Sequence, residues 1–146
     1  MLATSDNVAP LIARAGLSVV MFAHGAQKLL GWFGGYGFEG TLGYFTGSIG
    51  LPAFAGVAII LLEFFGPLLL IAGLATRPIA GAFVAIMAGA VWNEHLAHGF
   101  FMNWSGAQAG EGFEFHILLA TLAAVLVVMG GGRLSLDRRL SQHRQS

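Results

Sequence analysis

Three basic side chains, Arg14, His24 and Lys28, lie inside the first apolar run of the sequence. At about 100° per residue of an α-helix, they fall within an arc of about 80° and form one polar stripe. Ionisable residues inside a membrane span are costly unless they are paired or face a cavity. We therefore expect the stripe to point towards the acids of neighbouring helices, where bases can bind a polar ligand and transfer protons.

Glu63 lies in the middle of the second apolar run, AIILLEFFGPLLLIAG, about 15 Å from either end at 1.5 Å per residue. This position predicts a carboxyl group near the centre of the bilayer, between the levels of Arg14 and His24, where a basic side chain of the first run can reach it. Pro67 has no N–H to donate to the carbonyl of residue 63, which predicts a free backbone acceptor at the same level. Such an arrangement suits a binding site, and the alternative is an ion pair that only fixes helix register.

Acids and histidines also gather where the third apolar run ends and the fourth begins. They are Glu94, His95 and His98 in WNEHLAH, and Glu111, Glu114 and His116 in EGFEFH. Glu114 falls at about the depth of Lys28, so we expect an ion pair between these two residues. The cluster predicts a polar pocket in the outer half of the bundle. The alternative is that these groups lie in the wet interface, where they cost little.

The apolar runs that must position these groups extend over about residues 8–30, 53–75, 79–98 and 113–129. Each approaches the ~20 residues that a helix needs to cross the hydrocarbon of a bilayer. The chain of 146 residues is 56% hydrophobic and 10% charged, with a mean hydropathy of +0.76. Soluble domains average about 25% charged residues. The sequence therefore predicts an all-α membrane protein built as a bundle of four transmembrane helices.

The distribution of basic residues indicates how the bundle is oriented. The short linker between the second and third runs contains Arg77, and residues 133–146 hold four of the seven basic residues. Because cytoplasmic loops are enriched in Lys and Arg, we expect this linker and both termini in the cytoplasm, and two loops rich in glycine and aromatic residues outside. On this interpretation residues 1–132 form the transmembrane domain and residues 133–146 a basic cytoplasmic tail.

The composition also limits the chemistry. The chain contains no Cys, which excludes disulfides, Cys-ligated iron–sulfur clusters and covalently attached haem. The formal net charge is +0, which gives no reason to expect a nucleic-acid partner. Any redox role must therefore use a bound cofactor or a partner protein.

The third run carries Gly81, Ala85 and Gly89 at four-residue spacing. Small residues at this spacing let helices approach closely in lipid. We expect a packing surface within one bundle, and the alternative is the contact surface of a homo-oligomer.

Four segments together resemble the DoxX family of small bacterial membrane proteins: LIARAGLSVVMFAHGAQKLLGWFGG, LLEFFGPLLLIAGLATRPIA, the acid-bearing start of the fourth run, and the Gly-rich exit before LSLD. Arg14, the HGxxK segment from His24 to Lys28 and the ExxG segment from Glu63 to Gly66 are the positions that match the family's motifs. The resemblance covers nearly the whole chain. It implies a four-helix protein of the bacterial inner membrane that serves as an oxidoreductase subunit, as the related DoxD does in a thiosulfate:quinone oxidoreductase, with protein partners that deliver electrons.

These observations lead to one main hypothesis, a subunit of a quinone-linked membrane oxidoreductase whose outer pocket binds the quinone head group. Two-electron reduction of a quinone takes up two protons, so His24 and Glu63 are the candidate catalytic groups. The candidate cofactor-binding residues are Arg14, His24, Lys28, Glu63, His95, His98 and Glu114. A second hypothesis is a non-enzymatic scaffold or assembly factor. A third is a haem or metal protein that uses His24, His95, His98 and His116, although their spacing fits no particular metal and no metal ligand is assigned.

Overall fold

The computed structural model describes residues 6–143, and this part of the chain is helical without any strand. Its α-helices are α1 (Ala9–Leu30), α2 (Gly37–Gly47), α3 (Ala53–Ala72), α4 (Thr76–Ala90), α5 (Glu114–Met129) and α6 (Leu136–His143). Residues 1–5, at the start of the expected transmembrane domain, and residues 144–146, at the end of the expected tail, lie outside the described residues.

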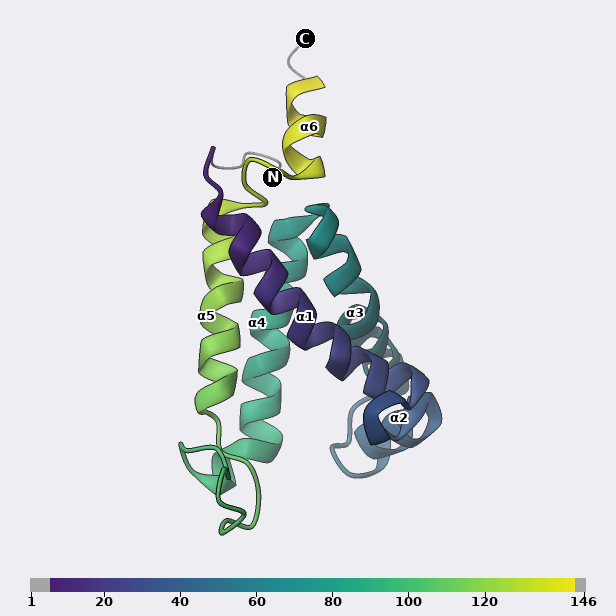
Figure 1. Cartoon of the computed structure of the whole chain (residues 1–146). Coiled ribbons are helices and arrows are strands. Elements are labelled where there is room, and N and C mark those ends of the chain that lie inside the picture. The colour runs from purple at the N-terminus through teal and green to yellow at the C-terminus, as the bar shows by residue number, and fades with distance from the viewer. Residues whose placement is uncertain (1–5, 144–146) are drawn as a thin grey trace.

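Four of the helices form the body of the molecule. α4 and α5 lie side by side as an antiparallel pair, and α1 crosses diagonally while packing against α3 (Figure 1). We refer to the two ends of the body as the α6 end and the α2 end. α1 begins and α5 finishes at the α6 end, whereas α2 and the segment 99–113 lie at the α2 end (Figure 1).

Within the described residues, three helical stretches are long and apolar enough to cross a membrane. They are Ala9–Leu30, Ala53–Ala72 and Thr76–His98, and the apolar helix α5 is shorter, at 16 residues. The prediction of an all-helical membrane protein is confirmed. Large apolar side chains such as Ile12, Val19 and Val128 point outwards with about 70% of their surface exposed, at 71%, 69% and 74%, which suits contact with lipid.

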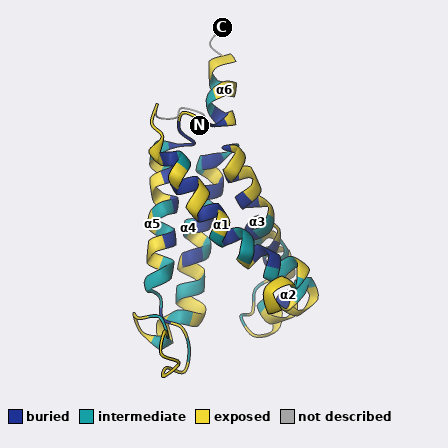
Figure 2. Cartoon of the chain, in the orientation of Figure 1, coloured by how far each residue is buried: buried dark blue, intermediate teal, exposed yellow. Residues whose placement is uncertain are grey.

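The buried core lies mainly towards the α6 end, while exposed residues predominate at the α2 end (Figure 2). Leu17 of α1, Phe83 of α4 and Leu126 of α5 are completely buried there. Glycines end two of the helices in the left-handed conformation, Gly31 after α1 with φ 73° and Gly73 after α3 with φ 68°. The body is therefore packed tightly at one end and opens towards the other.

The closest approach of α1 and α3 is at Gly25. An ideal Cβ placed on Gly25 would lie 2.3 Å from the carbonyl oxygen of Glu63 and 2.6 Å from Cα of Phe64. This carbonyl is the one that Pro67 leaves without a helical N–H donor. It was expected to be a free acceptor at a binding site, but the backbone of α1 covers it.

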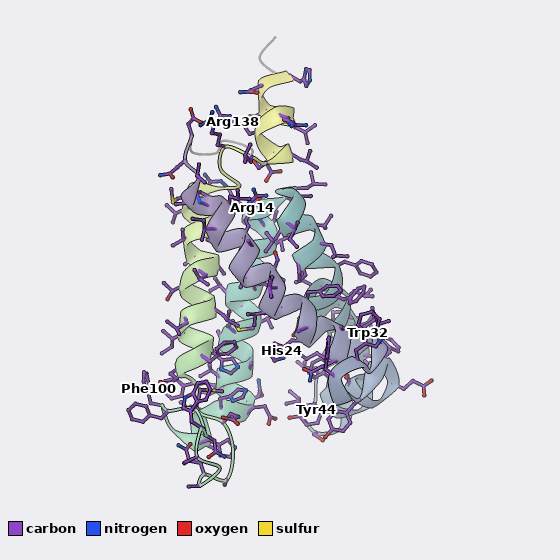
Figure 3. The ribbon with its side chains drawn as sticks, viewed as in Figure 1. Arg14, His24, Trp32, Tyr44, Phe100 and Arg138 are labelled. Carbon is purple, nitrogen blue, oxygen red and sulfur yellow. The ribbon has the colours of Figure 1, made fainter. Side chains whose placement is uncertain are left out.

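At the α6 end, Arg14 is completely buried. Its Nη1 donates hydrogen bonds to the carbonyls of Leu70, at 3.0 Å, and Ile71, at 3.2 Å, near the end of α3. Its Nη2 donates to the carbonyl of Leu134, at 2.7 Å. Arg14 thus satisfies carbonyls at the end of a helix, which otherwise lack intrahelical donors. The expectation that Arg14 shares a pocket with Glu63 is wrong, because its guanidinium turns to the α6 end (Figure 3).

The segment after α5, which the sequence predicts as a basic tail, contacts this end through a few buried residues, although most of its side chains are exposed. Asp137, in the first turn of α6, is 4% exposed, and its carboxylate accepts hydrogen bonds from the backbone N–H groups of Ala75 and Thr76, both at 2.8 Å. It therefore caps the N-terminus of α4 from 61 residues further along the chain. Arg138 forms an exposed ion pair with Asp6, and its hydrogen bond lowers the pKa of that carboxyl.

Two local structures at the α2 end differ from the sequence-based expectation. The first loop, expected to be an interfacial loop rich in glycine and aromatic residues, contains α2, which packs through Leu42 and Phe45 against Gly56 of α3. The third apolar run leaves the α-helical path in a π-helical turn, Val91–His95, followed by a 3₁₀ turn, Leu96–His98. A π-turn adds a residue to a helical turn, so side-chain directions beyond it no longer follow the 100° rule.

The expected small-residue packing surface is only partly used. Gly81 lies against Val127 of α5, with 3.9 Å between an added Cβ and the Val127 side chain. Gly89 would meet nothing within 4 Å. The part of this face nearer the α2 end therefore borders open space rather than a neighbouring helix.

Replacing Gly25 with Ala should destabilise the fold, because the new methyl group would overlap backbone atoms of α3 that cannot move independently. Overpacking of this kind costs about 1–3 kcal/mol, which exceeds the gain in helix propensity of up to about 1 kcal/mol. Thermal unfolding of the detergent-solubilised protein measures the effect. Gly16→Ala in the same helix is the control, because an added Cβ there meets nothing within 4 Å, and equal melting temperatures for the two variants would contradict the prediction.

Replacing Asp137 with Ala should remove the cap of α4 and cost about 1–2 kcal/mol of stability. Hydrogen exchange gives the most direct measurement, since the amides of Ala75 and Thr76 should lose protection while amides in the middle of α4 keep theirs. Asp137→Asn retains one acceptor oxygen and should show a smaller loss. Unchanged protection of both amides in Asp137→Ala would show that the carboxylate does not hold this helix end.

Candidate functional site

A cavity of about 760 Å³ lies between α1, α2 and α3 on one side and α4, α5 and the segment 99–113 on the other. Its polar lining consists of His24, Lys28, Glu63, Asn93, Glu94, His95, Glu111 and His116. Aliphatic and aromatic side chains form most of the remaining wall, among them Met21, Phe45 and Phe115. A mainly apolar cavity with a few polar groups is typical of a small-molecule site, and this volume lies in the usual range.

The centre of the cavity wall is an ion pair between Lys28 of α1 and Glu63 of α3. The Glu63 side chain is 3% exposed and the Lys28 side chain 29% exposed, so the carboxylate is buried and the ammonium group borders the cavity. A buried carboxylate in an apolar helix needs such a partner. The expected Lys28–Glu114 pair is therefore wrong, because Lys28 reaches the acid at the middle of α3 instead.

His24 lies one helical turn before Lys28 and lines the same cavity. Its side chain is on the part of α1 that faces α4, and Tyr44 of α2 lies nearer the open end (Figure 3). Gly25, next to His24, makes the close contact with α3 described above, so the backbone that carries His24 is held firmly.

Two histidines form the opposite wall. The rings of His95, from the π-helical turn, and His116, from α5, lie 4.0 Å apart between centroids with planes tilted by 39°. Nδ1 of His95 lies 2.8 Å from the carbonyl oxygen of Glu111. Nδ1 of His116 is buried and makes no hydrogen bond to any described residue. These contacts place two imidazoles side by side at the cavity, each with one ring nitrogen turned towards protein.

The segment 99–113 is an ordered cover at the α2 end of this wall. Glu114 accepts hydrogen bonds from the backbone N–H of Met102, at 2.9 Å, and from Nε1 of Trp104, at 3.4 Å. Glu111 accepts one from the backbone N–H of Asn103, at 2.6 Å. The two carboxylates therefore shape the loop that holds Met102 and Trp104 over the cavity.

The structure brings four of the seven sequence-based binding candidates together at the cavity. These are His24, Lys28, Glu63 and His95. The other three lie elsewhere: Arg14 binds carbonyls at the α6 end, Glu114 holds the loop, and His98 packs against Gly110. His95 ends the π-helical turn and His98 lies in the 3₁₀ turn that follows, and only His95 lines the cavity.

His116 lines the cavity but was not among the candidate binding residues, and the same is true of Asn93, Glu94 and Glu111. On helix α5 His116 points in a different direction from Glu114, which was taken as the ligand-facing residue. Its position in the first turn of an apolar helix could have identified His116 from the sequence, since an imidazole there needs a polar partner or a cavity. Within residues 6–143, no group of three or more His, Asp or Glu side chains is arranged to hold a metal ion.

The fold defines an α-helical membrane protein with a cavity between its helices. The DoxX family model matches residues 9–99, and the chain belongs to this family. It is 32% identical over 133 residues to a Bacillus subtilis (strain 168) protein named "Putative oxidoreductase CatD", covering 91% of this chain and 87% of that protein. It is 29% identical over 135 residues to "Inner membrane protein YphA" of Escherichia coli (strain K12), covering 88% of each. No solved structure matches the chain.

Breaking the Lys28–Glu63 pair from one side should be more harmful than removing both charges. Lys28→Met leaves the buried Glu63 carboxylate without a partner, which costs about 3–5 kcal/mol for a fully buried pair and less here because Lys28 borders the cavity. Adding Glu63→Gln to Lys28→Met should restore most of the lost stability. A double-mutant cycle of thermal unfolding in detergent measures this coupling, and strictly additive losses would contradict a direct interaction.

Proposed function

We propose that the protein is a subunit of a quinone-linked membrane oxidoreductase system and that its cavity binds the quinone head group. The observation that carries this proposal is the cavity itself, which combines a mainly apolar wall with the Lys28–Glu63 pair, His24 and two further histidines. A quinone ring needs apolar surface around it and hydrogen-bond partners for its oxygens. The family relationship and the oxidoreductase name of one relative support the same class of function.

In this proposal each polar residue has a distinct task. Lys28 and His24 donate hydrogen bonds to a ring oxygen, and the ammonium group stabilises negative charge that develops there. Glu63 keeps Lys28 in place and exchanges a proton with it or with His24. A bound quinone supplies two-electron, two-proton chemistry. The protein supplies the orientation of the ring and groups that hold protons.

Electrons must come from a partner protein, since the chain has no Cys and no metal-ligand cluster within its described residues. Aromatic side chains at the α2 end offer a surface for such a partner or for lipid head groups. Trp32, Phe33, Tyr36, Trp92 and Trp104 are all more than half exposed there. Aromatic residues are enriched both at membrane interfaces and at protein contacts.

We further propose that the chain crosses the bacterial inner membrane four times, with both termini in the cytoplasm. The antiparallel arrangement of α1, α3, α4 and α5 supports four crossings, and Arg77 and Arg133 at the α6 end support its cytoplasmic position. The name of the Escherichia coli relative supports the inner membrane. The cavity then lies in the half of the bilayer away from the cytoplasm.

Mass spectrometry of small molecules extracted from the purified protein tests the quinone proposal. Wild-type protein should retain quinone at close to one molecule per chain after extensive detergent washing. His24→Ala removes one hydrogen-bond donor to the ring, and Glu63→Gln removes the partner that keeps the Lys28 donor in place, so each should retain about tenfold less, the value of one such hydrogen bond. His98→Ala is the matched control because His98 does not line the cavity, and it should retain quinone like the wild type.

The outcome also distinguishes the quinone-linked function from a non-enzymatic scaffold role. If wild-type protein retains only bulk lipid, the quinone proposal fails and a non-enzymatic assembly role becomes the better account. Retention that is equal in all folded variants would show that quinone binds somewhere other than this cavity. Circular dichroism and thermal unfolding establish that each variant is folded.

A further inference from the structure

The contact of His95 with Glu111 determines which of its ring nitrogens carries a proton. A carbonyl oxygen only accepts hydrogen bonds, so Nδ1 of His95, at 2.8 Å, must donate to it. In the neutral imidazole, Nε2 then has a lone pair and acts as an acceptor. Nε2 has no hydrogen-bond partner among residues 6–143, and the side chain lines the cavity. His95 therefore presents an acceptor to a ligand.

His116 has the complementary arrangement. Its Nδ1 is buried without a partner among the described residues, and a buried N–H without an acceptor is rarer and more costly than an unused lone pair. The neutral ring therefore carries its proton on Nε2. Because His116 also lines the cavity, it offers a donor next to the acceptor of His95.

The two rings are close enough to bind one oxygen atom together. Their centroids are 4.0 Å apart with ring planes tilted by 39°, so both rings can reach an oxygen atom that lies beside them in the cavity. One oxygen between them can form two hydrogen bonds of about 3 Å. A hydroxyl group fits this pair, because it donates to one partner and accepts from the other. A carbonyl oxygen satisfies only His116 and leaves the Nε2 acceptor of His95 unpaired.

We propose that the His95–His116 pair is a hydroxyl-binding site that makes the cavity select the reduced, quinol form of the ring over the quinone form. This inference rests on the proposed function and adds which redox form is held more tightly. The opposite wall does not discriminate in the same way, since Lys28 and His24 donate to a ring oxygen in either form. Selectivity therefore comes from one acceptor atom, Nε2 of His95.

Binding of a short-chain quinol and its quinone measures the selectivity directly. Decylubiquinol and decylubiquinone are titrated anaerobically, at pH 8, into detergent-solubilised wild-type protein by calorimetry. The quinol should bind about tenfold more tightly, the value of one hydrogen bond that the quinone cannot form. His95→Phe keeps an aromatic ring beside His116 and should reduce this ratio to about one. His98→Phe is the control and should keep the wild-type ratio.

The outcomes separate this inference from the function on which it rests. If neither form binds the wild type, the proposed function fails. If both forms bind equally, the quinone site stands and the selectivity is overturned. A preference for quinol that survives His95→Phe also overturns the assignment to this pair.

A measurement on the wild-type protein tests the proposal without requiring that any variant fold. Nitrogen NMR of ¹⁵N-labelled histidines should show a proton on Nδ1 of His95 and on Nε2 of His116. Addition of decylubiquinol should shift the Nε2 resonance of His95, and decylubiquinone should leave it nearly unchanged. The opposite tautomer at His95 would overturn the proposal.

Discussion

The rest of the structure depends on one constraint, the presence of a carboxylate at the middle of an apolar helix. Glu63 is almost fully buried in α3, and the low dielectric of its surroundings demands a cation close by. Lys28 provides this cation from α1, so the ion pair fixes which turns of α1 and α3 lie opposite each other. Gly25, one turn before Lys28, then permits the backbone contact that this register requires, because a larger residue would overlap the α3 backbone. The ion pair and the helix crossing support each other.

This crossing makes the two ends of the molecule different. At the α6 end, Arg14 and Asp137 satisfy the backbone groups of α3 and α4, so the helices converge there around a buried core. At the α2 end, the α1–α3 and α4–α5 pairs separate, and the space between them is the cavity. Polar groups with free hydrogen-bonding capacity lie on this open side. The packing at the closed end therefore fixes the geometry of the cavity at the open end.

Much of this arrangement is present in the sequence pattern, and the parts that are not have physical causes. Hydrophobic runs and intramembrane charges predict the long helices, the importance of Glu63 and the cavity position of His24. The choice of Lys28 over Arg14 as the partner of Glu63 depends on the crossing point at Gly25, which periodicity does not reveal. His95 and His98 lie where a π-helical turn changes to a 3₁₀ turn, and such a change has no simple composition signal. Helix α2 was missed because its glycines favour a loop, although tertiary packing makes it helical.

The hydrogen bonds of Arg14 also have a consequence for how the protein is made. Its guanidinium belongs to α1, yet one of its acceptors, the carbonyl of Leu134, is separated from it by 120 residues and is synthesised later. During synthesis the inserted helix α1 carries a positive charge whose partners do not yet exist. An arginine near a helix end can snorkel towards the nearer membrane surface, where lipid head groups stabilise its charge until these acceptors are present. The final packing of α1 at the α6 end then follows synthesis of the segment after α5, which supplies this acceptor.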